Sequence, residues 1–281
     1  LKFSQTLDGH ELRKMSLEDG GSLSPEDGGF DVAWPAGDGI NTYEGDFFGQ
    51  TVTEVVGSKG YCVVEMSLDS DTRELALNEA RQHTKYEDVL AEVEAGYLGM
   101  SNTTKFASLD LPVSDQPESA LHRLDQQLTL LGTVMMATTE HTMNFTCWGR
   151  GNALMRVPRG SEDKEPRPLQ PSSAEDVSTL RNFMQWAAVR KVSMLYVLET
   201  SGGTLDLSMK GEPDIRLPLR PGIVVLFRHD LMDYTYKPEG TSLALQAWLL
   251  GDPNPMEMDG LPVYPEALLP VSKQIKGPPM P

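Results

Sequence analysis

Apolar residues recur at helical intervals in the first half of the chain. The strongest pattern spans 118–138, where apolar side chains follow one another every three or four residues. They are Leu121, Leu124, Leu128, Leu131 and Met135, followed by Thr138. A charged stretch at 71–82 comes after Ser70, a residue type that favours the N-cap of a helix. Residues 85–94 predict another helix, with Gly96 as its C-cap.

Short apolar runs separated by turns dominate from residue 144 onward. The runs have the composition typical of strands and cover 144–148, 192–198, 204–208, 223–227 and 243–249. A run at 60–66 has the same character. One helix is expected among them, because Ser172-Ser173-Ala174-Glu175 resembles a capping box ahead of apolar residues at helical spacing. Helices first and strands second predict an α+β fold, a jelly-roll-like antiparallel sheet with the 118–138 helix on its outer face.

The two ends of the chain differ in composition from the middle. Residues 1–49 are rich in glycine and acidic residues, and we expect them to lie extended on the surface, anchored by Phe30, Trp34 and Phe47-Phe48. Residues 251–281 are rich in proline and predict an extended linker. The predicted folded domain therefore covers 50–250.

Charge and cysteine content narrow the function classes. The 281 residues include 41 Asp and Glu against 24 Lys and Arg, a net charge of -17. Such a surface repels phosphate backbones and anionic lipids, so we expect no nucleic-acid partner. We also expect no membrane span, since no apolar run approaches the ~20 residues needed. Cys62 and Cys147 lie in apolar runs and indicate a reducing compartment, cytoplasm or plastid. Because the chain starts at Leu1 and ends in a proline-rich stretch, we interpret it as a piece of a longer protein.

The region from about 50 to 250 resembles the iron- and 2-oxoglutarate-dependent dioxygenases, in particular their prolyl hydroxylase branch. The matching segments occur in the family's order: Gly60–Val64, Phe145–Trp148, Met194–Leu198, Gly202–Leu205, Leu217–Phe227 and Leu243–Leu249. The resemblance implies a double-stranded β-helix (jelly roll) with flanking N-terminal helices. It does not by itself imply the activity, because one fold can serve many functions.

The residues that the resemblance would assign to the metal are absent. The chemistry needs two histidines and a carboxylate, with the first His and the carboxylate spaced His-x-Asp/Glu. None of His10, His83, His122, His141 and His229 has an acidic residue two positions later. The family pattern places that pair on Val157 and Arg159 and the second histidine on Asp233. The cation for 2-oxoglutarate falls on Thr241 or Ser242.

We therefore interpret the chain as a degenerate oxygenase, with no catalytic, cofactor-binding or metal-binding residues and no cofactor. A ligand pair formed by His229 and Asp230 is the less favoured alternative, because adjacent residues of a strand point to opposite faces. The opposite charges of Arg159 and Asp233 predict a salt bridge between them in place of the metal. A register one residue away would place Arg156 and Tyr234 there instead.

A second, shorter resemblance lies at 92–99. Glu92-Val93-Glu94-Ala95-Gly96-Tyr97-Leu98-Gly99 resembles the Glu-x-Glu-x-Gly-Tyr-Leu-Gly motif found upstream of the ketosynthase in type I-like polyketide synthases of dinoflagellates. Its six specified residues are Glu92, Glu94, Gly96, Tyr97, Leu98 and Gly99. The resemblance implies that the parent chain is a polyketide synthase, of the ketosynthase and acyltransferase class.

Three functions remain as hypotheses. The first is a non-catalytic docking or architectural domain, a pseudoenzyme, that precedes a ketosynthase and contacts it or other synthase components. The second is an active Fe(II)/2-oxoglutarate-dependent dioxygenase whose ligands lie elsewhere. The third is a pocket that binds an acyl or polyketide substrate or a carrier protein. Iron titration separates the first from the second, and a carrier-protein binding assay identifies the third.

Overall fold

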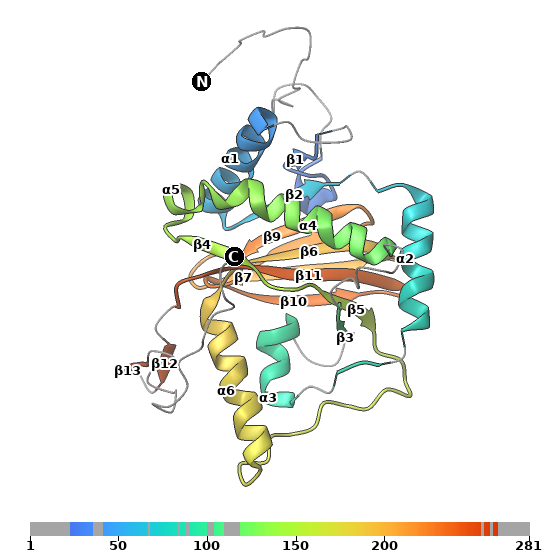
Figure 1. The fold of residues 1–281 in the computed structure, drawn as a ribbon, viewed down its shortest axis with the longest axis vertical. Helices are drawn as coiled ribbons and strands as arrows, with labels where there is room; N and C mark the ends of the chain where they lie inside the picture. The colour runs from blue at the N-terminus through green and yellow to red at the C-terminus, as the bar shows by residue number, and fades with distance from the viewer. Residues whose placement is uncertain are drawn as a thin grey trace, which may run out of the picture.

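The computed structural model describes residues 23–35, 42–66, 68–83, 85–87, 90–99, 104–109, 119–253, 256–258 and 261–263 (Figure 1). Its helices are α1 (Thr42–Lys59), α2 (Ser70–Gln82), α3 (Ala91–Glu94), α4 (Ala120–Met136), α5 (Thr139–Met143) and α6 (Ala174–Val189). A 3-10 turn, η1, spans Pro25–Asp27, and a π-helical turn, η2, continues α3 through Ala95–Gly99. None of the described helices is long and apolar enough to cross a membrane.

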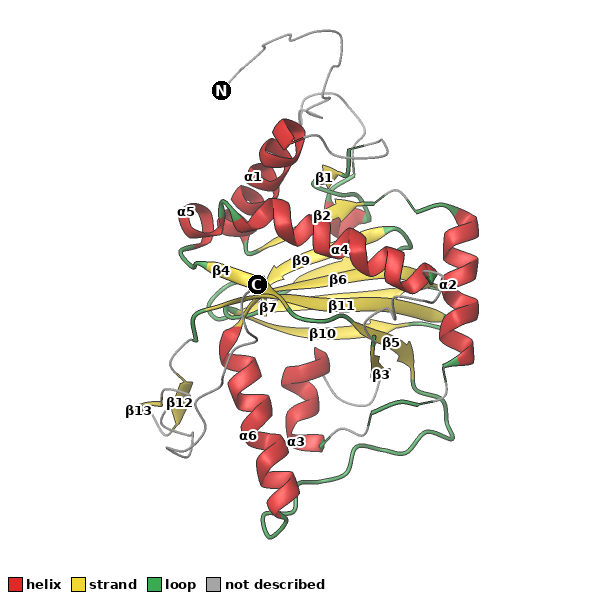
Figure 2. Cartoon of the chain, viewed as in Figure 1, coloured by secondary structure: helices red, strands yellow, loops and turns green. Residues whose placement is uncertain are grey.

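The strands form a large sheet, a small sheet and a hairpin (Figure 2). The strands of the large sheet are β1 (Val32–Ala33), β2 (Tyr61–Glu65), β3 (Thr104–Ser108), β4 (Cys147–Arg150), β5 (Leu154–Pro158), β6 (Arg190–Thr200), β9 (Ile223–Arg228) and β11 (Ser242–Gly251). Their order is β1-β2-β9-β6-β11-β5-β3, with β4 also paired to β11. The small sheet has the order β10-β7-β8 and comprises β7 (Gly203–Met209), β8 (Ile215–Pro218) and β10 (Met232–Pro238). All pairings except β1 with β2 are antiparallel, which confirms the predicted α+β jelly-roll fold.

The two faces of the large sheet are covered by different layers. Helices α1, α2 and α4 pack on one face, in a core that includes Leu124, Leu128 and Leu131 of α4 (Figure 1). The predicted 118–138 helix is thus confirmed on the outer face. The other face of the large sheet packs on the small sheet, and the space between the two sheets holds a second apolar core.

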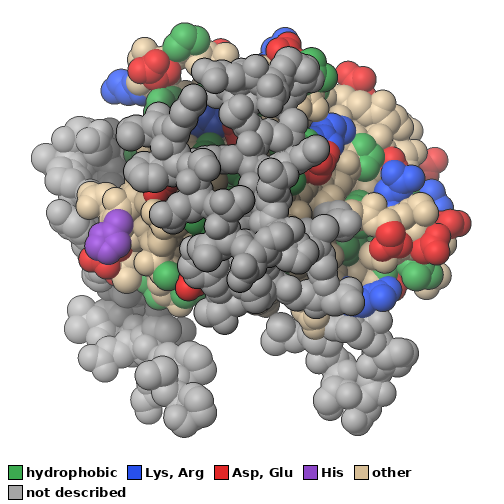
Figure 3. Space-filling view, turned by 90° about the horizontal axis from the view of Figure 1, so that it is seen from above, with side chains coloured by type: hydrophobic (Ala, Val, Ile, Leu, Met, Phe, Trp, Pro, Cys, Tyr) green, Lys and Arg blue, Asp and Glu red, His purple; other side chains and the backbone are tan. Residues whose placement is uncertain are grey.

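Seen from above, acidic and basic side chains are interspersed around the rim of the molecule (Figure 3).

Helix α1 was not expected, because the segment before residue 50 is rich in glycine. Two glycines of the helix itself, Gly49 and Gly57, explain why it packs there. A Cβ added at Gly49 would overlap the carbonyl oxygen of Val134, and one added at Gly57 would overlap that of Thr142. The small residues let α1 approach α4 and α5 at backbone distance, so tertiary packing overrides the low helix propensity of glycine.

The structure also corrects details at the two ends. Helix α1 begins at Thr42, inside the segment predicted to be extended. Among the expected anchors, the rings of Trp34 and Phe48 pack edge to face at 5.1 Å, and Phe30 packs on the inner core, whereas Phe47 is exposed. In the proline-rich end, β12 (Met256–Met258) pairs with β13 (Leu261–Val263) where an unpaired linker was expected. The rest of 254–281 lies outside the described residues, as does 1–22.

Candidate functional site

A row of polar side chains crosses the inner face of the large sheet. Alternation along each strand turns Arg156 of β5, Gln246 of β11 and Ser193 of β6 toward the small sheet, while their chain neighbours face the helices. All three are completely buried. Buried polar groups on a sheet are costly unless they are hydrogen-bonded, so their partners define what this site can do.

Arg156 lies at the centre of the row and has three hydrogen-bond acceptors. Its Nη1 donates to Oε1 of Gln246 at 2.6 Å. Its Nη2 donates to the carbonyl oxygen of Leu98 and to Oγ1 of Thr104, both at 2.7 Å. The guanidinium also lies 4.4 Å from the ring centroid of Tyr236, a cation–π distance. These contacts fill the interior around the side chain.

Gln246 extends the hydrogen-bond network from Arg156 to the small sheet. Its Nε2 donates to Oγ of Ser193 at 2.9 Å and to the hydroxyl of Tyr234 at 3.1 Å. A second contact joins the sheets, because the hydroxyl of Tyr236 on the small sheet lies 3.1 Å from that of Ser242 on the large sheet. The set formed by Arg156, Gln246, Ser193, Tyr234 and Thr104, called the Arg156 cluster below, therefore links both sheets.

The electrostatics of the Arg156 cluster favour a structural role over a catalytic or metal-binding one. Burial lowers the pKa of the Arg156 guanidinium, while the neighbouring Tyr234 and Tyr236 hydroxyls and the carboxylate of Glu94 act in the opposite direction. Burial likewise raises the pKa of the Tyr236 hydroxyl. A guanidinium is always protonated and has no acceptor, so it can neither take a proton nor bind a cation.

The 92–99 segment closes the space beside the Arg156 cluster. Leu98 is completely buried and supplies the carbonyl that accepts from Arg156. Glu94 is 1 % exposed and lies 3.6 Å from Arg159. Gly99 has a φ of +67°, and a Cβ there would overlap the ring of Tyr234. The side chain of Tyr97 lies outside what the structure describes.

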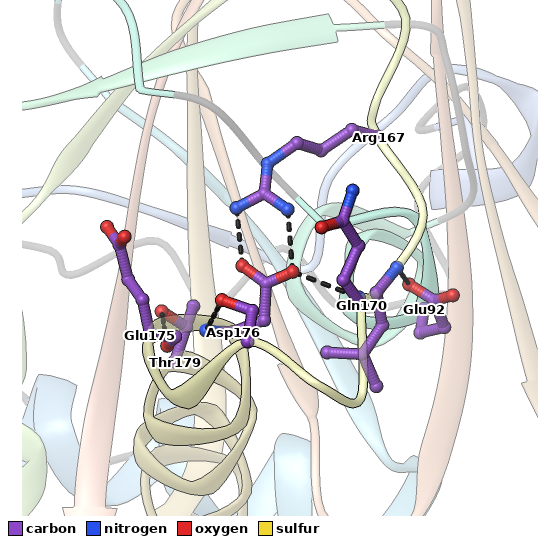
Figure 4. Close-up of polar contacts among 8 residues, drawn as sticks. Glu92, Arg167, Gln170, Glu175, Asp176 and Thr179 are labelled. Carbon is purple, nitrogen blue, oxygen red and sulfur yellow. Dashed lines mark hydrogen bonds and ion pairs between the residues drawn. The ribbon is translucent and has the colours of Figure 1, made fainter.

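Polar contacts also fix the outer end of this segment (Figure 4). An Oε of Glu92 accepts from the backbone N–H of Leu169 at 2.8 Å. Beside it, Arg167 donates to both carboxylate oxygens of Asp176, at 2.7 and 2.5 Å, and the N–H of Gln170 donates to the same group. This pairing with Arg167 holds the pKa of Asp176 down, to about 2. The loop before α6 is thereby fixed to the start of the motif.

His229 is a half-buried histidine that packs against aromatic rings. It follows β9, and its ring lies against the rings of Phe227, Tyr234 and Trp248 at centroid distances of 6.3, 5.7 and 6.2 Å. Burial, with a contribution from Arg190, lowers its pKa to about 3. Asp230 turns away to pair with Arg228 at 2.8 Å, so the alternative His229–Asp230 ligand pair is not formed.

The residues predicted for the vestigial metal site do not come together. Val157 packs on the helical face of the sheet, and Asp233 is exposed on β10. Arg159 pairs with Glu94 and donates to the carbonyl of Lys164, so its predicted salt bridge to Asp233 is wrong. Of the predicted positions, Ser242 is inside, bonded to Tyr236.

The alternative register does describe the interior. Arg156 and Tyr234 both face inward and both bond to the side-chain amide of Gln246. Sequence analysis missed Gln246, Thr104 and Ser193. Gln246 could have been found from the sequence, because it is the only amide in the apolar run Leu243–Leu249. A polar side chain buried in such a run needs a hydrogen-bond partner.

Comparison with known proteins agrees with this architecture. A prolyl hydroxylase from Trichoplax adhaerens, solved with a peptide fragment of the hypoxia inducible factor oxygen degradation domain, is 14% identical. The match covers 75% of this chain and 94% of that one, with a TM-score of 0.53. A prolyl-4-hydroxylase from Pseudomonas putida is 13% identical over 73% of this chain and 98% of its own, with a TM-score of 0.48. No protein-family model and no curated protein matches the chain. The fold is that of the 2-oxoglutarate and Fe(II) oxygenases.

The side chains present do not fit the iron of those enzymes. Such iron is held by two histidines and a carboxylate with open positions. Within the described part of the chain, no three His, Cys, Asp or Glu side chains gather where they could hold a metal ion. The positive charge of Arg190 acts on His229, and the buried guanidinium of Arg156 lies between the two sheets. A fixed cation at that place repels a second one.

Proposed function

We propose that this chain is a non-catalytic, oxygenase-like domain that serves as a docking or architectural module of a polyketide synthase. The observation that carries the non-catalytic part is the complete burial of Arg156, hydrogen-bonded to Gln246, Leu98 and Thr104 between the sheets. A buried charge is costly unless hydrogen-bond partners compensate it, and here three acceptors bond the two terminal nitrogens of the guanidinium, while its Nε has no partner among the described residues.

The polyketide synthase context is supported by the sequence of the 92–99 motif. The acidic composition adds a second argument, since a net charge of -17 favours basic partner surfaces and disfavours nucleic acid. A ketosynthase that follows in the same assembly is the partner we infer. Its contact would need only the outer surface of the domain, because buried side chains of the described residues lie between the two sheets.

Two assays test the proposal. In the first, the purified chain is mixed with a ketosynthase domain from a dinoflagellate polyketide synthase, and the mass of the mixture is followed by light scattering. A complex of defined stoichiometry is expected, and two separate species at millimolar protein would overturn the docking role. A parallel mixture with an acyl carrier protein in place of the ketosynthase tests the binding-pocket alternative. A complex with the carrier protein and none with the ketosynthase would favour that alternative.

The second assay tests catalysis. The chain is incubated with Fe(II), ascorbate, oxygen and 2-oxoglutarate, and succinate is measured. We expect no succinate above a reaction that lacks the protein. Succinate formation that follows protein concentration would overturn the non-catalytic reading and support the dioxygenase alternative.

A further inference from the structure

The Glu92–Gly99 motif is mostly turned into the molecule. Among its described residues Val93, Glu94, Leu98 and Gly99 are buried, and only Glu92 and Gly96 are exposed. A segment that recognises a partner would present side chains to solvent. The observed burial calls for an intramolecular role.

The motif lies beside the free side of the small sheet. Strand β10 is paired with β7, and among the described residues no strand pairs with its other edge. Turn η2 contacts β10, and α3 leads into it from below the sheet (Figure 1). An uncovered edge next to a hydrophobic interior is a liability that proteins cover with a helix or loop.

Five of the six specified residues of the motif, all but Tyr97, have a contact that closure requires. Glu92 fixes the loop before α6 through the N–H of Leu169, and Glu94 lies by Arg159 at the end of β5. Gly96 faces Phe183 of α6, where an added Cβ would lie 3.3 Å from the ring. Leu98 satisfies Arg156.

Gly99 is the most constrained position of the motif. Its φ of +67° belongs to the left-handed region, which favours glycine, and its missing side chain leaves room for the Tyr234 ring. Tyr234 in turn bonds to Gln246, the partner of Arg156. The motif backbone therefore touches the Arg156 cluster at two points, the Leu98 carbonyl and Gly99.

We infer that the Glu92–Gly99 motif is an intramolecular plug that closes the space between the two sheets by capping the Arg156 cluster. Glu92, Glu94, Gly96, Leu98 and Gly99, five of the six residues that the motif specifies, supply contacts that this closure needs. The inference goes beyond the proposed function, because it requires neither a polyketide synthase partner nor the absence of iron. Either the plug inference or the proposed function can therefore prove wrong while the other holds.

The test compares two glycines with similar backbones. Gly99 and Gly211 both have left-handed φ values, +67° and +89°, but a Cβ at Gly211 would meet nothing within 4 Å. Gly99→Ala and Gly211→Ala therefore share the backbone strain, and only the first adds a clash. We expect Gly99→Ala to lower the Tm by on the order of 5 °C more than Gly211→Ala. In a Tyr234→Ala background this excess should largely disappear.

Hydrogen exchange of the unmodified chain provides a readout that does not depend on any variant folding. If 95–99 is a plug, its amides exchange as slowly as those of β10. In Gly99→Ala, exchange should rise in 95–99, β5 and β10 and stay unchanged in β2 and β9. Exchange of 95–99 within seconds in the unmodified chain would overturn the inference. So would equal Tm losses for the two glycine variants.

Discussion

The guanidinium of Arg156 donates a 2.6 Å hydrogen bond to the side-chain amide of Gln246, and neither residue is exposed to solvent. The two residues come from neighbouring strands of the large sheet, and Gln246 extends the contact to Tyr234 on the small sheet. Among the described residues no set of metal ligands gathers, and the space between the two sheets holds a hydrogen-bonded cation, the Arg156 guanidinium. The stability of the domain should therefore depend on Arg156.

Replacing Arg156 by lysine tests that dependence. Lysine keeps the charge but cannot reach Gln246, Leu98 and Thr104 together, since it lacks the planar fork of donors. We expect Arg156→Lys to lower the free energy of unfolding by about 2–4 kcal/mol, because buried acceptors lose their partner. Urea denaturation measures the change.

Arg159→Lys is the matched control for this change. Arg159 stands three residues later, outside the Arg156 cluster, with its ion pair to Glu94 at the longer distance of 3.6 Å. We expect a smaller loss than for Arg156→Lys, because a lysine ammonium at this position keeps a charge that can pair with Glu94. Equal losses for the two variants would show that the cluster does not stabilise the fold.

His229 should make stability depend on pH. Its pKa is lowered to about 3 in the folded chain, from 6.5. Between these values the unfolded chain binds a proton that the folded chain does not, so stability is full above pH 6.5 and falls as the pH is lowered toward 3. His229→Phe keeps the ring contacts and removes the titration. Between pH 7.5 and pH 5, His229→Phe should lose about 1 kcal/mol less unfolding free energy than the unmodified chain. This figure allows for the partial exposure of the His229 ring.

Urea midpoints at the two pH values measure this effect. His141 on α5 is exposed, and His141→Phe is the matched control for replacing a histidine by phenylalanine. An unchanged pH dependence in His229→Phe would contradict the prediction.

The close approach of α1 to α4 depends on Gly49. Alanine is the better helix former, and on propensity alone Gly49→Ala would stabilise α1 by up to about 1 kcal/mol. Because the added Cβ overlaps the carbonyl of Val134, we expect instead a loss of about 1–3 kcal/mol. Thermal unfolding measures it. Gly149→Ala on β4 is the control, and it should change stability little because a Cβ there meets nothing within 4 Å. A gain of stability in Gly49→Ala would refute the packing argument.

The sequence predicted the elements with strong periodicity and missed those formed by tertiary contact. The apolar repeats of α4 and the runs of β6, β9 and β11 needed no long-range information. Helix α1 needs the backbone of α4 and α5 to explain its glycines. The strand β10 was missed because its inward tyrosines alternate with polar residues, a weaker pattern than a continuous apolar run.

The predicted pair lay on the wrong face of both strands, since Arg156 is three residues before Arg159 and Tyr234 is one residue after Asp233. Side chains alternate along a strand, so a register shifted by one position exchanges the inner and outer faces. Val157 and Asp233 were assigned to the interior, and the structure places Arg156 and Tyr234 there. The bond from Arg156 to the Leu98 carbonyl joins residues 58 positions apart through a backbone atom. No residue pattern encodes such a contact.

The most direct test of the central claim, that the interior is built around Arg156 and not around a metal, is a Mn²⁺ titration. Mn²⁺ serves as an air-stable substitute for Fe(II), and electron paramagnetic resonance measures the free ion with and without 2-oxoglutarate. The account predicts that the free Mn²⁺ signal matches a protein-free titration up to millimolar metal, in both series. One bound Mn²⁺ per chain at micromolar affinity, strengthened by 2-oxoglutarate, would contradict it.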